Sequence, residues 1–195
     1  AVLVASAAPF RYVLGAALFG SAAAVVAAAT SSYRWARVTA FLDLGADPLG
    51  GSYQVVQSLV ALGTGGLWGV GLGASRARWS FLPNAHTDFI FSIIGEETGL
   101  AGSMIVILLF VALTVAGVLI ALRASDRFGR LVAVGITTWL VAQALVNIGG
   151  VIGVLPITGV PLPFVSIGGS ALLTEMAAVG VLISVARTGG REPVA

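Results

Sequence analysis

The sequence predicts an all-α protein, a polytopic transmembrane helix bundle with a large extracytoplasmic loop. Of its 195 residues, 58% are hydrophobic and only 9% are charged, whereas a soluble domain carries about 25% charged residues. Several apolar runs approach the roughly 20 residues that a spanning helix needs. Because cysteine is absent, the chain forms neither disulfides nor a thiolate metal site. Its ten basic residues form no cluster that would follow a phosphate backbone, which argues against nucleic-acid binding.

Four stretches are predicted to span the membrane within a single domain that covers residues 1–195, namely 12–30, 89–122, 131–153 and 169–187. In the first, small residues recur at every fourth position and form a face suited to close helix packing, namely Ala16, Gly20, Ala24 and Ala28. The alternative is simply an alanine-rich helix. The chain opens on an apolar segment without a signal peptide, so we expect it to be part of a longer protein.

Two non-spanning regions, residues 31–88 and 154–168, separate these stretches. In the first, a short helix is expected from Ser52 through Leu62, followed by Gly63–Gly73 with six glycines in eleven residues. Exposed N–H groups there could cradle a phosphate, but a bent loop is favoured because no P-loop fingerprint fits. The second region is rich in proline and glycine. Irregular backbone near membrane depth is tolerated only against protein or a wet cavity.

The arginines predict the orientation of the chain. The short loops on one side hold six arginines, against four in the much longer loop on the other side. The side with the denser positive charge should be cytoplasmic, which places 31–88 and 154–168 outside. The four outer arginines favour an anionic partner, unless they pair with Asp43 and Asp47; they are Arg34, Arg37, Arg76 and Arg78.

The ionisable residues gather in Leu82–Glu97 (LPNAHTDFIFSIIGEE), which holds the only histidine and three of the eight acidic residues. Ionisable groups at a membrane boundary are candidates for function, although Thr87 or Asp88 could instead cap the next helix. A carboxylate beside arginines suits a lipid-linked pyrophosphate substrate. The carboxylate would remove a proton from a sugar hydroxyl, and the arginines would hold the leaving pyrophosphate. A transporter whose acidic residues carry protons explains the same residues equally well.

Ordered motifs along nearly the whole chain resemble those of the SEDS family (FtsW, RodA, SpoVE). They are YRWARVTAF (33–41), YQVVQSL (53–59), GLGAS (71–75), LPNAHTDFIF (82–91), GEE (95–97), QALVNIG (143–149), LP (155–156), GVPLPFVS (159–166) and GGS (168–170). The resemblance implies the last four of ten spanning helices. It also implies a peptidoglycan glycosyltransferase that polymerises lipid II at the outer face of the cytoplasmic membrane. Its partners would be a class B penicillin-binding protein, which is a transpeptidase, and other divisome membrane proteins.

The resemblance also assigns roles to residues. Asp88, in the His-Thr-Asp-Phe motif, would be the catalytic base, and Glu96 would be the second catalytic residue, with an orienting hydrogen bond as its alternative role. The expected substrate-binding residues are Arg76, Arg78, Gln57, His86, Asn147, Ser166 and Ser170. Arg78 stands where the family usually has lysine, which replaces a point charge with a bidentate fork. The arginines or a divalent cation (Mg or Mn) would balance the pyrophosphate, and no ligand spacing is diagnostic of a metal site.

The residue before His86 bears on the branch of the family. Ala85 resembles the division branch, which works at the septum, whereas the elongation branch commonly has arginine there. Asn84 replaces the usual glutamate, so no acidic role is expected of it. A lipid II flippase, an elongation-type polymerase and a scaffold for the transpeptidase remain the alternatives.

Overall fold

The computed structural model describes residues 9–30, 35, 41, 52–75 and 87–189. Its helices are α2 (Phe10–Ala29), α4 (Tyr53–Gly65), α5 (Ile90–Arg123), α6 (Arg127–Val151) and α7 (Gly169–Gly189). The described ranges contain no strand, and the predicted all-α class is confirmed. Three of the helices, α5, α6 and α7, are long and apolar enough to cross a membrane, and α2 contains a shorter apolar stretch, Arg11–Ala27.

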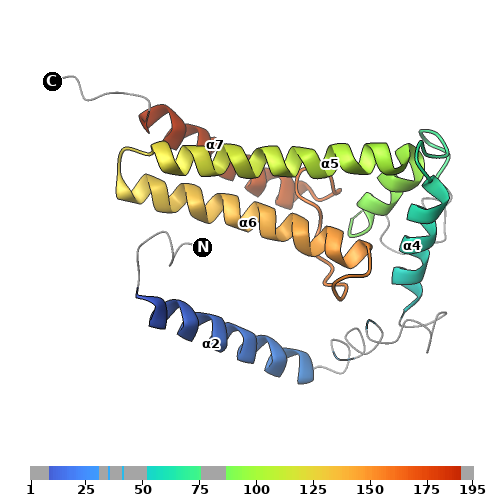
Figure 1. The fold of residues 1–195 in the computed structure, drawn as a ribbon, viewed down its shortest axis with the longest axis horizontal. Coiled ribbons are helices and arrows are strands. Elements are labelled where there is room, and N and C mark those ends of the chain that lie inside the picture. Colours follow the sequence, from blue (N-terminus) through green and yellow to red (C-terminus); the bar gives the residue numbers. More distant parts are fainter. Residues whose placement is uncertain (1–8, 31–34, 36–40, 42–51, 76–86, 190–195) are drawn as a thin grey trace.

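Helices α5 and α6 lie side by side, α7 packs against both, and α4 stands at the end where α5 begins (Figure 1). The larger hydrophobic core lies at that same end, where α4, the start of α5, the end of α6 and the loop before α7 meet. Its buried members are Ala61, Phe89, Phe91, Ile93, Ala144, Val151 and Leu162. The larger core of the described bundle therefore lies beside the turn that contains Asp88.

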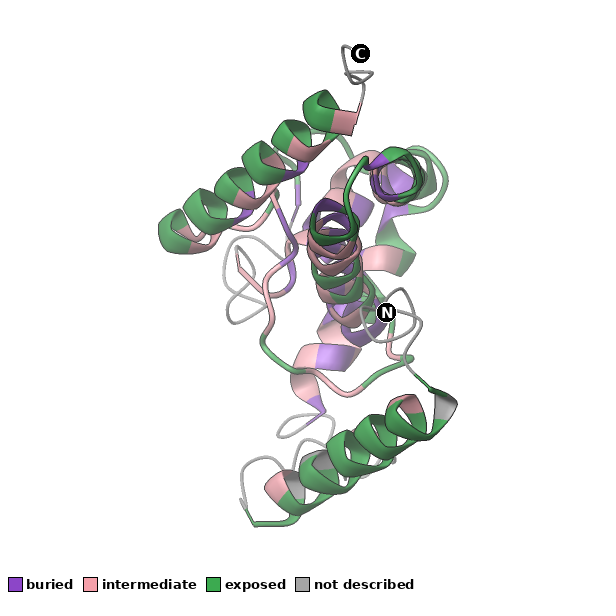
Figure 2. Cartoon of the chain, turned by 90° about the vertical axis from the view of Figure 1, so that its left-hand side faces the viewer, coloured by how far each residue is buried: buried purple, intermediate pink, exposed green. Residues whose placement is uncertain are grey.

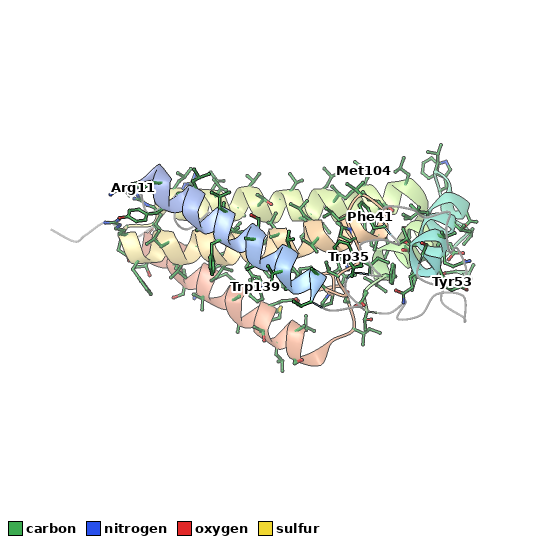
Figure 3. The ribbon with its side chains drawn as sticks, turned by 90° about the horizontal axis from the view of Figure 1, so that it is seen from below. Arg11, Trp35, Phe41, Tyr53, Met104 and Trp139 are labelled. Atoms are coloured by element: carbon green, nitrogen blue, oxygen red, sulfur yellow. The ribbon has the colours of Figure 1, made fainter. Side chains whose placement is uncertain are left out.

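The outward faces of the helices remain apolar and exposed (Figure 2). Met104 on α5 and Trp139 on α6 are examples on the outside of the bundle (Figure 3). Helix α2 lies apart from the bundle (Figures 1 and 2). The small-residue face predicted for it is not packed at Ala16 or Gly20, which are exposed, and the side chains of Ala24 and Ala28 lie outside the described part.

Helix α6 begins earlier than the predicted 131, because Asp126 caps it. The carboxyl group of Asp126 accepts a hydrogen bond of 2.7 Å from the N–H of Gly129. A side-chain oxygen at this position satisfies one of the donors that a helix start leaves free. Two arginines that were expected in a loop, Arg127 and Arg130, therefore lie in the first turn of α6.

Helix α5 is broken at Gly99, which has φ 69° and ψ −163°. The break frees backbone groups that would otherwise pair within the helix, and the glycine-rich segment pairs with them. The N–H groups of Leu100 and Ala101 donate to the carbonyls of Gly66 and Leu67 at 2.9 and 3.3 Å. In return, the N–H groups of Val70 and Gly71 donate to the carbonyls of Glu96 and Glu97 at 2.9 and 3.1 Å. We call this set of four bonds the break pairing.

The break pairing decides between the two interpretations of the glycine-rich segment. The segment is a bent loop, and the N–H groups of Val70 and Gly71 already have partners within the protein. The phosphate-cradle hypothesis is therefore wrong for these two groups. Helix α4 also continues three residues past the predicted end, Leu62, because Gly65 lets its backbone approach the carbonyl of Gly95 closely.

We predict that Gly65→Ala lowers the free energy of unfolding by about 1–3 kcal/mol, because its methyl group would overlap the Gly95 carbonyl oxygen. Gly63→Ala is the matched control. It lies two residues earlier in the same helix, and nothing stands within 4 Å of the added methyl group. The control should be neutral or stabilising by up to about 1 kcal/mol. Thermal unfolding in detergent measures both, and equal shifts in Tm would contradict the close approach.

The loop between α6 and α7 is fastened by Glu175, whose side chain is only 3% exposed. One carboxyl oxygen accepts from Gln143 Nε2 at 3.3 Å, and the other accepts from the N–H of Phe164 at 2.8 Å. Gln143 Nε2 also donates to the carbonyl of Pro161 at 3.1 Å. Phe164 has a positive φ of 64°, an uncommon conformation for a large side chain. These hydrogen bonds hold the loop in that shape, and Glu175 is a buried partner of the loop within the bundle.

We predict that Glu175→Ala loosens this loop, because it leaves the N–H of Phe164 without its partner. An unpaired buried group costs about 1–3 kcal/mol. Limited proteolysis in detergent should show faster cleavage within 153–168, together with a lower Tm. The control is Thr174→Ala, an exposed neighbour whose hydroxyl binds only the carbonyl of Ser170 in its own helix. Unchanged cleavage in the Glu175 variant would show that the loop is held by other contacts.

Candidate active site

The predicted base, Asp88, lies in a turn formed by residues 87–89, directly before α5. Its side chain is half-buried, and the next residue, Phe89, is only 1% exposed and belongs to the core. The N-cap position of α5 is Phe89, so neither Thr87 nor Asp88 occupies it. Within the described part of the chain, no hydrogen bond ends on the carboxyl group of Asp88. The carboxyl group therefore does not cap α5 and is available to react with a bound group.

Two of the predicted residues, Asn147 and Ser166, bind the backbone of this turn. Asn147 Nδ2 donates to the carbonyl of Asp88 at 2.8 Å and to the carbonyl of Val160 at 2.7 Å. Ser166 Oγ donates to the carbonyl of Thr87 at 2.6 Å and accepts from the N–H of Leu162 at 2.7 Å. The carbonyls of Thr87 and Asp88 precede α5, and the two side chains satisfy them. The turn is thereby fixed to both α6 and the loop 153–168.

Glu96 lies deeper, in the first part of α5, with 4% exposure. Its Oε2 accepts a hydrogen bond of 2.5 Å from Ser75 Oγ. Ser75 is itself buried, and it ends the glycine-rich segment directly before Arg76. Glu96 therefore holds the end of the glycine-rich segment through this hydrogen bond.

Three predicted substrate-binding residues lie outside the described residues, namely Arg76, Arg78 and His86. Two others make no described side-chain hydrogen bond to the turn. Gln57 is half-buried on α4, and Ser170 is exposed in the first turn of α7. Among the described residues, no three His, Asp or Glu side chains come close enough together to hold a metal ion. The described protein groups alone thus provide no built cation site.

A pair of buried serines was missed by the sequence reasoning. Ser58 on α4 donates to the carbonyl of Val151 and shares a hydrogen bond of 2.7 Å with Ser92 Oγ on α5. Both serines are fully buried. The one signal in the sequence is that Ser58 shares a face of the short helix with Gln54 and Gln57, at spacings of three and four residues. Their hydrogen bonds join α4, α5 and the end of α6 beneath the turn of Asp88.

The assembled side chains have a definite chemical capacity. A half-buried carboxyl group projects from a turn whose backbone is fixed on both sides. A positioned carboxylate removes a proton from a bound hydroxyl. The described part of the site therefore suits activation of a hydroxyl group on a bound acceptor.

Comparisons with known proteins show the family of this chain. The family model FTSW_RODA_SPOVE, described as "Cell cycle protein", matches residues 1–190. "Stage V sporulation protein E" of Bacillus subtilis (strain 168) is 48% identical over 158 residues, covering 81% of this chain and 43% of that protein. "Probable peptidoglycan glycosyltransferase FtsW" of Geobacter sp. (strain M18) is 42% identical over 184 residues, covering 94% and 50%. "Peptidoglycan glycosyltransferase MrdB" of Escherichia coli (strain K12) is 47% identical over 154 residues, covering 78% and 42%.

A solved structure is also similar. It is described as "Structural coordination of polymerization and crosslinking by a peptidoglycan synthase complex", and the matching chain is 32% identical with a TM-score of 0.68. The match covers 94% of this chain and 51% of that one. The present chain thus spans about half the length of the relatives that it matches. The resemblance seen in the motifs is confirmed: this chain is a multi-pass membrane protein that belongs to the FtsW/RodA/SpoVE family of cell cycle proteins.

Proposed function

We propose that this chain carries the catalytic turn of a peptidoglycan glycosyltransferase that polymerises lipid II at the outer face of the cytoplasmic membrane. The observation that carries the proposal is the free carboxyl group of Asp88, held on a turn that Asn147 and Ser166 fix from two sides. Two relatives, which are 42% and 47% identical to this chain, have names that include peptidoglycan glycosyltransferase. The substrate and the activity of the whole protein are carried over from that likeness.

In the proposed reaction, Asp88 takes the proton from the 4-hydroxyl of the acceptor sugar. The hydroxyl oxygen forms a bond to the anomeric carbon of the donor while the bond from that carbon to the pyrophosphate oxygen breaks. Undecaprenyl pyrophosphate leaves with the bonding electrons, and the configuration at the anomeric carbon is inverted. A positioned carboxylate base supplies about 10²–10⁴-fold in rate.

Arg76 and Arg78 would bind the leaving pyrophosphate, because guanidinium groups match phosphate oxygens in a bidentate manner. The hydrogen bond between Glu96 and Ser75 supports this role, since it anchors the residue directly before Arg76. Glu96 then acts by positioning the arginine segment. Gln57, His86 and Ser170 are retained as proposed substrate contacts.

The proposed membrane arrangement follows from the positive-inside rule. Helix α2 is a fourth membrane span in addition to α5, α6 and α7. The regions 31–88 and 154–168 face outward. The turn of Asp88 then lies where lipid II is exposed. A class B penicillin-binding protein is the proposed partner, since the similar solved structure is a peptidoglycan synthase complex that couples polymerization to crosslinking. Ala85 favours the division branch, and hence the septum and its membrane proteins.

We predict that Asp88→Asn reduces glycan polymerisation at least 10²-fold, because an amide cannot accept the proton of the acceptor hydroxyl. The assay uses purified lipid II and the protein at its full natural length with its transpeptidase partner. Moenomycin is present to silence the other polymerase class. The matched control is Asp126→Asn, which keeps a good helix cap and lies at the connection between α5 and α6.

The outcomes separate the proposal from its rivals. Polymer from the wild type and the Asp126 variant, with none from the Asp88 variant, supports the glycosyltransferase. Wild-type rates from the Asp88 variant would remove Asp88 from the role of base. Absence of polymer from every variant, with lipid II still crossing the bilayer, would indicate a transporter.

A further inference from the structure

Asn147 has one atom whose hydrogen bonding is incomplete. Its side chain is 4% exposed, and both hydrogens of Nδ2 point to backbone carbonyls, those of Asp88 and Val160. The other side-chain atom, Oδ1, is buried and has no hydrogen-bond partner within the described protein. Buried polar atoms are nearly always paired with protein or ordered water. The missing partner of Oδ1 therefore requires an explanation.

A small cavity beside Asn147 supplies one. It lies between the turn of Asp88, the end of α6 and residues 157–160, and its volume is about 10 Å³. That is room for about one water molecule and for no larger group. The polar side chains among the lining residues are Asp88, Asn147 and Thr158. A water molecule there would find the two or more polar partners that a buried water needs.

We propose that one ordered water molecule occupies this cavity and donates a hydrogen bond to Asn147 Oδ1. The water leaves its second hydrogen and its lone pairs for Asp88, Thr158 or the loop backbone. Both donors of Asn147 are then on backbone carbonyls, and its buried oxygen accepts from the water. Asn147 is therefore a positioning residue for Asp88 rather than the substrate ligand that its motif suggested.

The consequence for the rate rests on the proposed function, whereas the water site does not. The bond from Asn147 reaches the backbone of Asp88, so losing it displaces the carboxyl group without removing any contact to lipid II. Misplacement of a catalytic group by about 1 Å costs about 10²-fold in rate. A residue that acts in this way lowers kcat and leaves KM nearly unchanged.

Two variants test the proposal in the full-length protein with its transpeptidase partner. Asn147→Asp keeps the size of the side chain and removes the Nδ2 donors. Gly150→Ala adds a methyl group at the cavity lining, and the nearest atom to that group, Ile157 Cα, is 3.6 Å away, so the fold accommodates it. Gly180→Ala on α7 is the control, because nothing stands within 4 Å of its added methyl group.

We expect Asn147→Asp to lower kcat about 10²-fold and Gly150→Ala about 10-fold, with KM within about threefold of wild type and Gly180→Ala unchanged. A high-resolution structure of the wild type should show density for one water at Asn147 Oδ1, and the Gly150 variant should show none. A raised KM with unchanged kcat in the Asn147 variant would make Asn147 a substrate ligand. If that variant does not fold, Gly150→Ala decides alone.

Two further outcomes would overturn the proposal. An empty cavity in the wild-type structure would remove the water site, and an unchanged kcat in a Gly150 variant that has lost the water would remove its positioning role. Failure of the proposed function is distinguishable from both. In that case the wild type makes no polymer while the density at Asn147 Oδ1 is present.

Discussion

The break pairing between the glycine-rich segment and α5 is the constraint on which the rest of the structure depends. Inside a membrane, backbone N–H and C=O groups cannot form hydrogen bonds with water. Wherever a helix is interrupted, the freed groups must therefore find hydrogen-bond partners within the protein. At Gly99 four such groups are exchanged with residues 66–71. This exchange joins the segment after α4 to both sides of the break in α5. Glu96, whose carbonyl takes part in the exchange, also binds Ser75 at the end of the same segment through its side chain.

The same constraint is met differently on the other side of the site. There the irregular backbone of 153–168 is held by polar side chains that project from the spanning helices, Gln143, Asn147 and Glu175. Buried polar groups of this kind are costly unless they are fully paired. Placed as they are, they make the turn of Asp88 the meeting point of α5, α6 and the loop. The carboxyl group of Asp88 therefore stands on a turn that is held from two sides.

Much of this architecture was accessible from the sequence. Long uncharged runs predict the spanning helices, and the motif order indicates the family. Asn147 and Ser166 could be assigned to the neighbourhood of Asp88 through their motifs. The structural features that could not be predicted from the sequence depend on tertiary contacts. Asp126 starts α6 early through one hydrogen bond, and the glycine-rich segment pairs with a helix break that no periodicity reveals.

The role of individual side chains was harder to predict than their location. Ser58 and Ser92 look like ordinary small residues in apolar helices, and only the fold shows that they bind each other. Asn147 looks like a substrate ligand because it is polar and near the base. Its geometry shows that its donors are directed at the main chain. A sequence motif indicates that a residue is important, whereas the structure shows which atoms that residue binds.

The hydrogen bonds that hold the loop 153–168 affect how the sequence of this protein can evolve. Asn147, Gln143, Ser166 and Glu175 all grip main-chain atoms, the carbonyls of residues 87, 88, 160 and 161 and the amide of residue 164. Hydrogen bonds to main-chain atoms do not depend on which side chains the bound residues carry. A change of the Val160 side chain therefore leaves the hydrogen bond to the Val160 carbonyl in place. The hold on the loop tolerates substitution at such a position.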